Sequence, residues 1–237
     1  MLYPGIRPSL FIIFLFFLIP TGCSEKKNFK LQGATFENQW IVIQPAQPLH
    51  FTGSLTIDLY IKLHEYPNDW TTIIAKRKTD HKNEFSLRLK NKNNGHWYFG
   101  SESAVTVLRW DPEKLLPLGE WVRLTLVRDS WRKKLMIYKN CELKASKNIK
   151  PSLRVQKADV PITLLRQGAQ CLHATLAEIR IWDRALSPGL IQQVFFGSDL
   201  DKHRIRPVAV WRFNSVSNIS GYGDAFLQPE IFSENSL

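Results

Sequence analysis

Acidic residues and cysteine are scarce in this chain of 237 residues. Asp and Glu total 21 against 32 Lys and Arg, which gives a formal net charge of +11. Such an excess of positive charge favours acidic partners, namely nucleic acid, anionic lipid or acidic glycans. Of the three cysteines, Cys141 and Cys171 fit neither the common zinc-ligand spacings nor a Cys-x-x-Cys redox motif. The sequence also lacks tandem repeats and low-complexity segments.

The apolar run at the N-terminus is too short to cross a membrane. It extends over ten residues from Leu10 to Ile19 and follows a short segment that carries Arg7. At about 1.5 Å per residue, such a helix cannot span a hydrocarbon core of about 30 Å. The run therefore predicts the hydrophobic segment of an export signal that covers residues 1–22.

The four residues after this run, Pro20-Thr21-Gly22-Cys23, resemble a bacterial lipobox, in which the Cys receives diacylglycerol. The pattern prefers Leu, Val or Ile three residues before the Cys, where this chain has Pro20. The resemblance implies a lipoprotein of the bacterial cell envelope that is anchored at Cys23, with residues 23–30 as a tether. The alternative is ordinary signal cleavage and secretion, with Cys23 as a spare thiol.

Export limits the choice of partners and of cysteine chemistry. An oxidising compartment permits a disulfide, and lipidation of Cys23 leaves an even pair, so Cys141 and Cys171 are predicted to be bonded. Nucleic acid is disfavoured as a partner. Acidic glycans and the membrane surface remain.

Alternation of apolar and polar residues dominates the chain after residue 30. From Leu55 to Leu63 every second residue is Leu or Ile, which predicts a half-buried strand whose other face carries Asp58 and Lys62. The same alternation predicts strands at 85–89, 122–126 and 177–181. Further strands are predicted at 40–43, 71–75, 96–100, 106–110, 135–138, 162–165 and 208–213. Many short strands without alternating helices indicate an all-β, antiparallel sandwich or jelly roll.

One short helix is predicted near the C-terminus. Ser187 is placed to cap its N-terminus, Pro188 suits its first turn, and Gly197 suits its end. Four apolar residues share one face at helical spacing: Leu190, Ile191, Val194 and Phe195.

Three segments, in order, resemble motifs of the laminin-G-like family of concanavalin A-like lectins. They are FTGSLTI at 51–57, LGEWVRLTLVR at 118–128, and AEIRIWDRALS at 177–187. The resemblance covers about residues 31–197 and implies a jelly-roll sandwich. The domain is expected to occupy residues 31–214, with its last strand near 208–214 and a C-terminal tail at 215–237. The Asp-Gly hairpin turn usual in the family is replaced by Asn140-Cys141, and Asn tolerates the positive φ that such a turn needs.

Catalytic and metal-binding patterns are weak. A glycosidase needs two carboxylates about 5–9 Å apart, whereas Glu102 and Glu113 are isolated in the sequence and the six histidines are scattered. The chain is therefore predicted not to be an enzyme, and a divergent glycoside hydrolase or lyase is the weaker alternative. No cofactor is predicted, although Asp199 and Asp201 are candidate calcium ligands, with a simple solvated turn as the alternative.

Aromatic and basic residues are the candidates for ligand binding. Trp121, Trp182 and Trp211 are expected in the core. Four other tryptophans lie near predicted turns or strand ends, where an aromatic ring can stack on a sugar or simply pack: Trp70, Trp97, Trp110 and Trp131. Basic clusters also lie near turns: Lys76, Arg77 and Lys78; Lys90 with Lys92; and Arg132, Lys133 and Lys134.

These residues favour a non-enzymatic extracytoplasmic module that binds carbohydrate or an acidic surface ligand. The alternative function is that of a structural or protein-interaction lipoprotein of the cell envelope. In that case, the basic clusters are dispersed solvated charges.

Overall fold

The computed structural model describes residues 32–44, 49–67, 69–79, 82–90, 96–100, 107–112, 115–150, 155–167, 170–197, 205–215, 218–223 and 230–233. The predicted export segment, Cys23, Lys92, Asp199 and Asp201 lie outside these ranges. Within them, no helix is long and apolar enough to cross a membrane.

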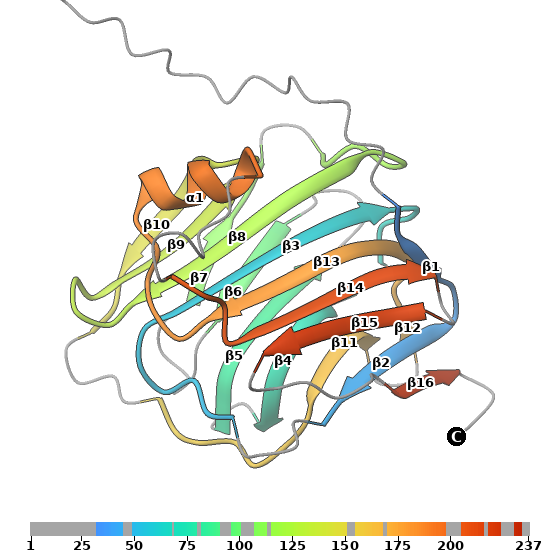
Figure 1. The fold of residues 1–237 in the computed structure, drawn as a ribbon, viewed down its shortest axis with the longest axis horizontal. Coiled ribbons are helices and arrows are strands. Elements are labelled where there is room, and N and C mark those ends of the chain that lie inside the picture. Colours follow the sequence, from blue (N-terminus) through green and yellow to red (C-terminus); the bar gives the residue numbers. More distant parts are fainter. Residues whose placement is uncertain are drawn as a thin grey trace, which may run out of the picture.

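Two antiparallel sheets face one another and form a sandwich (Figure 1). The first sheet has the order β10-β9-β8-β3-β13-β14-β15, and β1 also pairs with β13. Its strands are β1 (Ala34–Phe36), β3 (Leu55–Leu63), β8 (Trp121–Asp129), β9 (Lys134–Lys139), β10 (Glu142–Asn148), β13 (Ala174–Trp182), β14 (Ala209–Ser215) and β15 (Asn218–Gly223).

The second sheet has the order β16-β2-β11-β4-β5-β6-β7, and β12 pairs with β11. Its strands are β2 (Gln39–Ile43), β4 (Thr71–Thr79), β5 (Lys82–Lys90), β6 (His96–Gly100), β7 (Val107–Trp110), β11 (Ile162–Gln167), β12 (Gln170–Cys171) and β16 (Glu230–Ser233). The all-β sandwich expected from the alternating sequence is therefore confirmed. The apolar positions of that alternation, such as Ile57, Leu87 and Leu124, fill the space between the two sheets.

The single helix, α1 (Pro188–Phe195), lies on the outer face of the first sheet (Figure 1). Ser187 caps it by accepting a hydrogen bond from the Leu190 amide, and Gly197 follows its end with φ 75°. Ile191 and Val194 are the buried residues of the predicted apolar face. The predicted helix, its cap and its end are confirmed.

The outer face of β3 is more buried than the half-buried pattern predicted. Asp58 is buried there, and its charge is paired with that of Arg123, whose Nη2 donates to Asp58 Oδ2 at 2.5 Å. Arg123 Nη1 donates to the Val194 carbonyl of α1 at 2.8 Å, so this ion pair fastens the helix to the sheet. Alternation alone does not reveal that a helix covers the polar face of a strand.

The β9–β10 hairpin keeps a two-residue turn without an Asp-Gly sequence. Asn140 and Cys141 both have positive φ, 49° and 64°, and Lys139 pairs directly with Glu142. These values define a type I′ turn, whose twist matches that of the flanking strands. The expected tolerance of Asn140 for positive φ is confirmed.

The C-terminal part of the chain contributes more strands than predicted. β14 pairs with β13, and β15 lies beyond it, so β14 is an interior strand. β16 pairs with β2 of the second sheet. The sandwich therefore extends past residue 214 into the predicted tail. The sequence NISGYG of β15 lacks the apolar alternation that identified the other strands.

The structure does not show the predicted disulfide between Cys141 and Cys171. Cys171 is present as a thiol in β12, opposite Arg166 of the second sheet. Cys141 belongs to a hairpin of the first sheet and packs against the apolar cluster beneath α1. The even number of cysteines gave no information about the sheets to which they belong.

Candidate functional site

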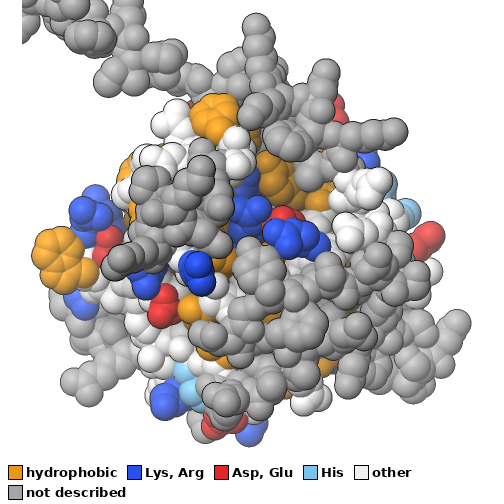
Figure 2. All heavy atoms as spheres, viewed as in Figure 1, with side chains coloured by type: hydrophobic (Ala, Val, Ile, Leu, Met, Phe, Trp, Pro, Cys, Tyr) orange, Lys and Arg blue, Asp and Glu red, His pale blue; other side chains and the backbone are white. Residues whose placement is uncertain are grey.

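Aromatic and basic side chains meet at the β8–β9 turn, which lies at one end of the sandwich. Trp131 is 84% exposed there, and the Arg132 guanidinium lies 5.8 Å from the centre of its ring. Figure 2 shows an exposed hydrophobic group at this end of the molecule, with Lys and Arg side chains around it. An indole with such exposure is available to a ligand, because it contributes little to the core.

Hydrogen bonds to backbone groups of the β8–β9 turn hold it in shape. Asp129 Oδ1 accepts from the amides of Trp131 and Arg132 at 3.0 and 2.8 Å. Lys133 has φ 54°, and its carbonyl accepts from the Ile149 amide at 2.7 Å. The turn is therefore fixed to the segment that follows β10, and its exposed side chains extend from a defined backbone.

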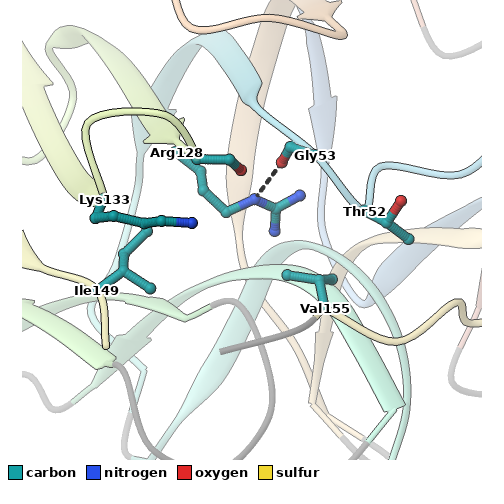
Figure 3. Close-up of a pocket in the computed structure, with 7 residues that line it drawn as sticks. Thr52, Gly53, Arg128, Lys133, Ile149 and Val155 are labelled. Carbon is teal, nitrogen blue, oxygen red and sulfur yellow. Dashed lines mark hydrogen bonds between the residues drawn. The ribbon is translucent and has the colours of Figure 1, made fainter. Parts of the chain in front are cut away.

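A pocket of about 350 Å³ lies beside this turn, where β3 begins and β8 ends. Its volume is at the lower end of the range of ligand pockets, about 300–1,000 Å³. Such a size suits one small unit of a ligand. Segments distant in the sequence line it (Figure 3): Thr52, Gly53, Arg128, Ser130, Lys133, Ile149 and Val155.

Arg128 is the buried charge of this pocket, with only 1% of its surface exposed. Its Nε donates to the Gly53 carbonyl at 2.7 Å and its Nη1 to the Glu84 carbonyl at 2.6 Å. Its Nη2 donates to the Phe51 carbonyl. A guanidinium has five N–H donors, and within the described part of the chain these three carbonyls are their acceptors. Burial lowers the pKa of Arg128 to about 10, although the nearby Glu84 carboxylate acts in the opposite direction.

Glu84 lies behind Arg128 and is itself fully buried. Its carboxylate accepts from the amides of Phe51 and Ala158 at 2.5 and 2.8 Å, and it contacts His50 Nδ1 at 2.8 Å and Lys76 Nζ at 3.2 Å. Burial raises the pKa of Glu84, but these hydrogen bonds and the Lys76 charge hold it below its ordinary value. The carboxylate is therefore ionised and fixes the loop before β3, which supplies one wall of the pocket.

The predicted basic cluster at 76–78 is divided by the fold. Lys76 is 2% exposed and pairs with Glu84, so it supports the pocket from inside rather than lying on the surface. Arg77 is half-buried and Lys78 is exposed. The cluster at 132–134 is exposed as a whole, and Lys133 lines the pocket.

The other predicted tryptophans do not join Trp131. Trp110 belongs to the main core, and the backbone of Trp97 pairs with those of Trp110 and Leu89, while its side chain lies outside the described part. The side chains of Arg88 and Lys90 lie against the ring of Trp70. Both belong to the C-terminal end of β5, whereas Glu84 lies near the start of that strand. Trp70 and Trp131 therefore belong to separate places on the molecule.

The tryptophans that were expected in the core follow that prediction in two of three cases. Trp182 and Trp211 are buried. Trp121 is half-buried at the start of β8, with Lys62 Nζ 4.9 Å from the centre of its ring.

Metal binding finds no support among the residues that the structure describes. They contain no group of three or more His, Cys, Asp or Glu side chains that could hold a metal ion. The candidate calcium ligands Asp199 and Asp201 lie outside the described ranges.

The sequence contains one signal for the pocket. Val122, Leu124 and Leu126 face the core, and the next position in this alternation is Arg128, which pairs with Leu55. An arginine at a core-facing position needs buried acceptors and therefore marks an unusual site. Thr52, Ser130, Ile149 and Val155 carry no comparable signal, because only the fold brings them together.

The model of the concanavalin A-like lectin/glucanases superfamily matches residues 35–192. The match covers more than half of the chain and includes the strands around the pocket. The chain belongs to this superfamily, and the predicted resemblance is confirmed. No curated protein sequence matches the chain.

Solved structures with the same fold come from several organisms. A candidate carbohydrate-binding protein from Bacteroides ovatus aligns over 85% of this chain and 59% of its own, with 16% identity and a TM-score of 0.59. A heptameric SAP-like pentraxin from Limulus polyphemus aligns over 85% of this chain and 100% of its own, with 14% identity and a TM-score of 0.51.

Domain 4 of an extracellular arabinanase from Geobacillus stearothermophilus, determined with arabinotriose, also shares the fold. It aligns over 68% of this chain and 75% of its own, with 20% identity and a TM-score of 0.52. At these identities the likenesses establish the fold.

Proposed function

We propose that this protein is a non-enzymatic carbohydrate-binding module whose ligand site is the pocket end of the sandwich. The observation that carries the proposal is the position of Trp131, which is 84% exposed on a fixed turn directly beside the pocket. An indole face suits the apolar C–H face of a sugar ring. One sugar stacks on Trp131, and a neighbouring unit occupies the pocket.

The lining of the pocket supports recognition of a polar ligand. Thr52 and Ser130 carry hydroxyls, Lys133 carries an ammonium group, and Ile149 and Val155 supply apolar surface. This mixture of a few polar groups with apolar walls is typical of small-ligand sites. Sugars present hydroxyls and C–H groups side by side, so they match such a lining.

The lining also supports binding without hydrolysis. Its seven described residues include no Asp or Glu, whereas glycoside hydrolysis usually requires two carboxylates. The names of the similar structures agree with a binding role. One is a candidate carbohydrate-binding protein, and another is an arabinanase domain in complex with arabinotriose.

The proposed setting is the bacterial cell envelope, with the module tethered to the membrane through a lipid on Cys23. The support is the apolar run from Leu10 to Ile19 followed by the lipobox-like sequence. The anchor is tested by separating the membrane and soluble fractions of cells that produce the wild type or a Cys23→Ala variant. A variant that stays in the membrane fraction as the wild type does would contradict it.

The test of glycan binding is a glycan array followed by calorimetry on the purified protein at physiological salt. We expect Trp131→Ala to weaken binding of the selected glycan at least about tenfold, which corresponds to about 1.4 kcal/mol. The matched control is Leu118→Ala, because Leu118 is also an exposed apolar residue but precedes β8 at the other end of the sandwich. Equal affinities of the two variants, or the absence of any glycan ligand, would refute the proposal and favour a structural or protein-interaction role.

A further inference from the structure

The pocket has the chemistry of an anion site, and this inference rests on the proposed function. We infer that the pocket binds the carboxylate or sulfate group of an acidic sugar unit, so that the natural ligand is an acidic glycan. The reasons are the charge buried around the pocket, the donors that face it, and the charge of the surface that continues from it.

The first reason is the environment of the buried Arg128. Lys76, Glu84 and Asp129 are also buried, and Asp129 accepts from the amides of Trp131 and Arg132 in the β8–β9 turn. Lys76 contacts Glu84 directly, whereas the hydrogen bonds of Arg128 go to three neutral carbonyls. A buried charge that has no direct ion pair lowers stability, and Glu84 lies near Arg128 without such a pair. An anion in the pocket would add a negative charge beside Arg128.

The second reason is the direction of the donors. Figure 3 shows the Lys133 side chain extending across the pocket toward Arg128, with its ammonium group inside. Thr52 lies on the opposite side, and Ser130 also contributes to the lining. Two cations and two hydroxyls therefore border a space that has no described acidic lining residue. Carboxylate and sulfate groups accept hydrogen bonds strongly from cationic donors, because both partners are then charged, and hydroxyls donate to them as well.

The third reason is the charge of the adjoining β9–β10 hairpin. Residues 130–150 carry seven basic side chains and one acidic side chain, so they supply +6 of the net charge of +11. Glu142 pairs with Lys144 at the far end of the hairpin. Arg132, Lys133 and Lys134 lie at the pocket end, and Ile149, which bonds to the turn, brings Lys150 there. A glycan with repeated acidic units would keep its charges near this surface beyond the pocket.

The experiment compares one sugar chain with and without its charges. Calorimetry would measure binding of tetragalacturonate, its fully methyl-esterified form and a heparin tetrasaccharide, each at low and at physiological salt. We expect at least one of the two acidic chains to bind, and to bind about tenfold more tightly than the neutral ester. Increasing salt should weaken this preference, because part of the surface charge is screened.

The matched variants are Lys133→Met, directly before β9, and Lys139→Met, at the end of β9, and each removes one positive charge. Lys133→Met should reduce affinity for the acidic chain about tenfold and should reduce affinity for the ester by a smaller factor. Lys139→Met should retain most of the preference. Thermal unfolding verifies that both variants are folded. We expect both to fold, because Lys133 is exposed and Lys139 is only half-buried.

Four outcomes are informative. Acidic preference that depends on Lys133 supports the inference. Equal binding of the acidic and esterified chains, lost in Trp131→Ala, overturns the inference and leaves the proposed function intact. Binding to phosphatidylserine vesicles in place of all three sugars assigns the charge to a membrane surface and overturns the inference. No binding to any sugar on the array or in this set removes both proposals.

Discussion

Buried charged side chains, rather than exposed ones, organise the pocket end of this sandwich. Glu84 receives two backbone amides and two side-chain partners, and Arg128 donates to three carbonyls from the segments around it. Phe51 contributes to both groups, its amide to Glu84 and its carbonyl to Arg128. The loop before β3 is therefore held by two opposite charges, which fixes one wall of the pocket before any ligand arrives.

Removal of the Glu84 charge should destabilise the whole domain. Glu84→Gln keeps the size of the side chain but leaves Lys76 as a buried cation without its carboxylate partner, which costs about 3–5 kcal/mol. The measurement is urea unfolding at neutral pH. Glu142→Gln is the control, because Glu142 is exposed in its pair with Lys144, and it should change stability by less than about 1 kcal/mol. A small loss in both variants would show that Glu84 does not carry the loop.

The same carboxylate predicts a pH dependence of stability. The pKa of Glu84 in the folded state is lower than its ordinary value of 4.5. The unfolded chain therefore takes up the proton first as the pH falls. The stability that the ionised group contributes is complete above pH 4.5 and is lost as the pH falls through the lower folded value. Glu84→Gln should lack this part of the acid dependence, and an unchanged acid profile would contradict the assignment.

Helix α1 depends on the sheet beneath it. Eight residues form a marginal helix in isolation, so tertiary contacts must hold it in place. Arg123 supplies such a contact by joining Asp58 of β3 to the Val194 carbonyl near the C-terminus of the helix. Burial lowers the pKa of Arg123, but the Asp58 carboxylate raises it above its ordinary value. The charge is therefore permanent, and it lies at the negative end of the helix dipole.

Loss of the Asp58 carboxylate should release the helix. Asp58→Asn leaves Arg123 buried without its counter-ion, with an expected loss of about 3–5 kcal/mol in the free energy of unfolding. Hydrogen exchange should show faster exchange of the α1 amides than of the amides in the second sheet. Asp183→Asn is the control, because Asp183 is exposed at the strand-to-helix corner and its loss should cost less than about 1 kcal/mol. Uniform exchange throughout the variant would refute a specific role in holding α1.

The elements that the sequence predicts are those with two-residue or helical periodicity. β3, β8 and β13 alternate clearly, and α1 carries a cap, a proline and a terminal glycine. The sequence ELKASKN of β10 is largely exposed at the edge of the sheet, so no apolar face identifies it. β12 has only two residues, and the short sequences of β15 and β16 give little periodicity. These strands form because their neighbours offer an edge to pair with, which is a tertiary effect.

The fold of the whole molecule creates the pocket, which explains why so little of it could be predicted. Thr52, Arg128, Ile149 and Val155 come from four separate segments. Trp131 and Lys133 were predicted because their types and their turn are local features. Lys76 and Trp110 had the same local features, but the fold places them inside. The sequence shows which side chains can bind a ligand, and the packing decides which of them a ligand can reach.

The most direct test of the central claim is to locate a bound glycan by NMR on isotope-labelled protein. Titration with the tightest ligand from the array should shift the Trp131 indole signal and the amides of residues 130–134 and 52–53. The remaining seven of the eight tryptophan indoles should move little. Shifts that centre on Trp70, Arg88 and Lys90 would place the ligand on the other sheet and contradict the assignment of the site. The absence of any shift at saturating ligand would contradict carbohydrate binding itself.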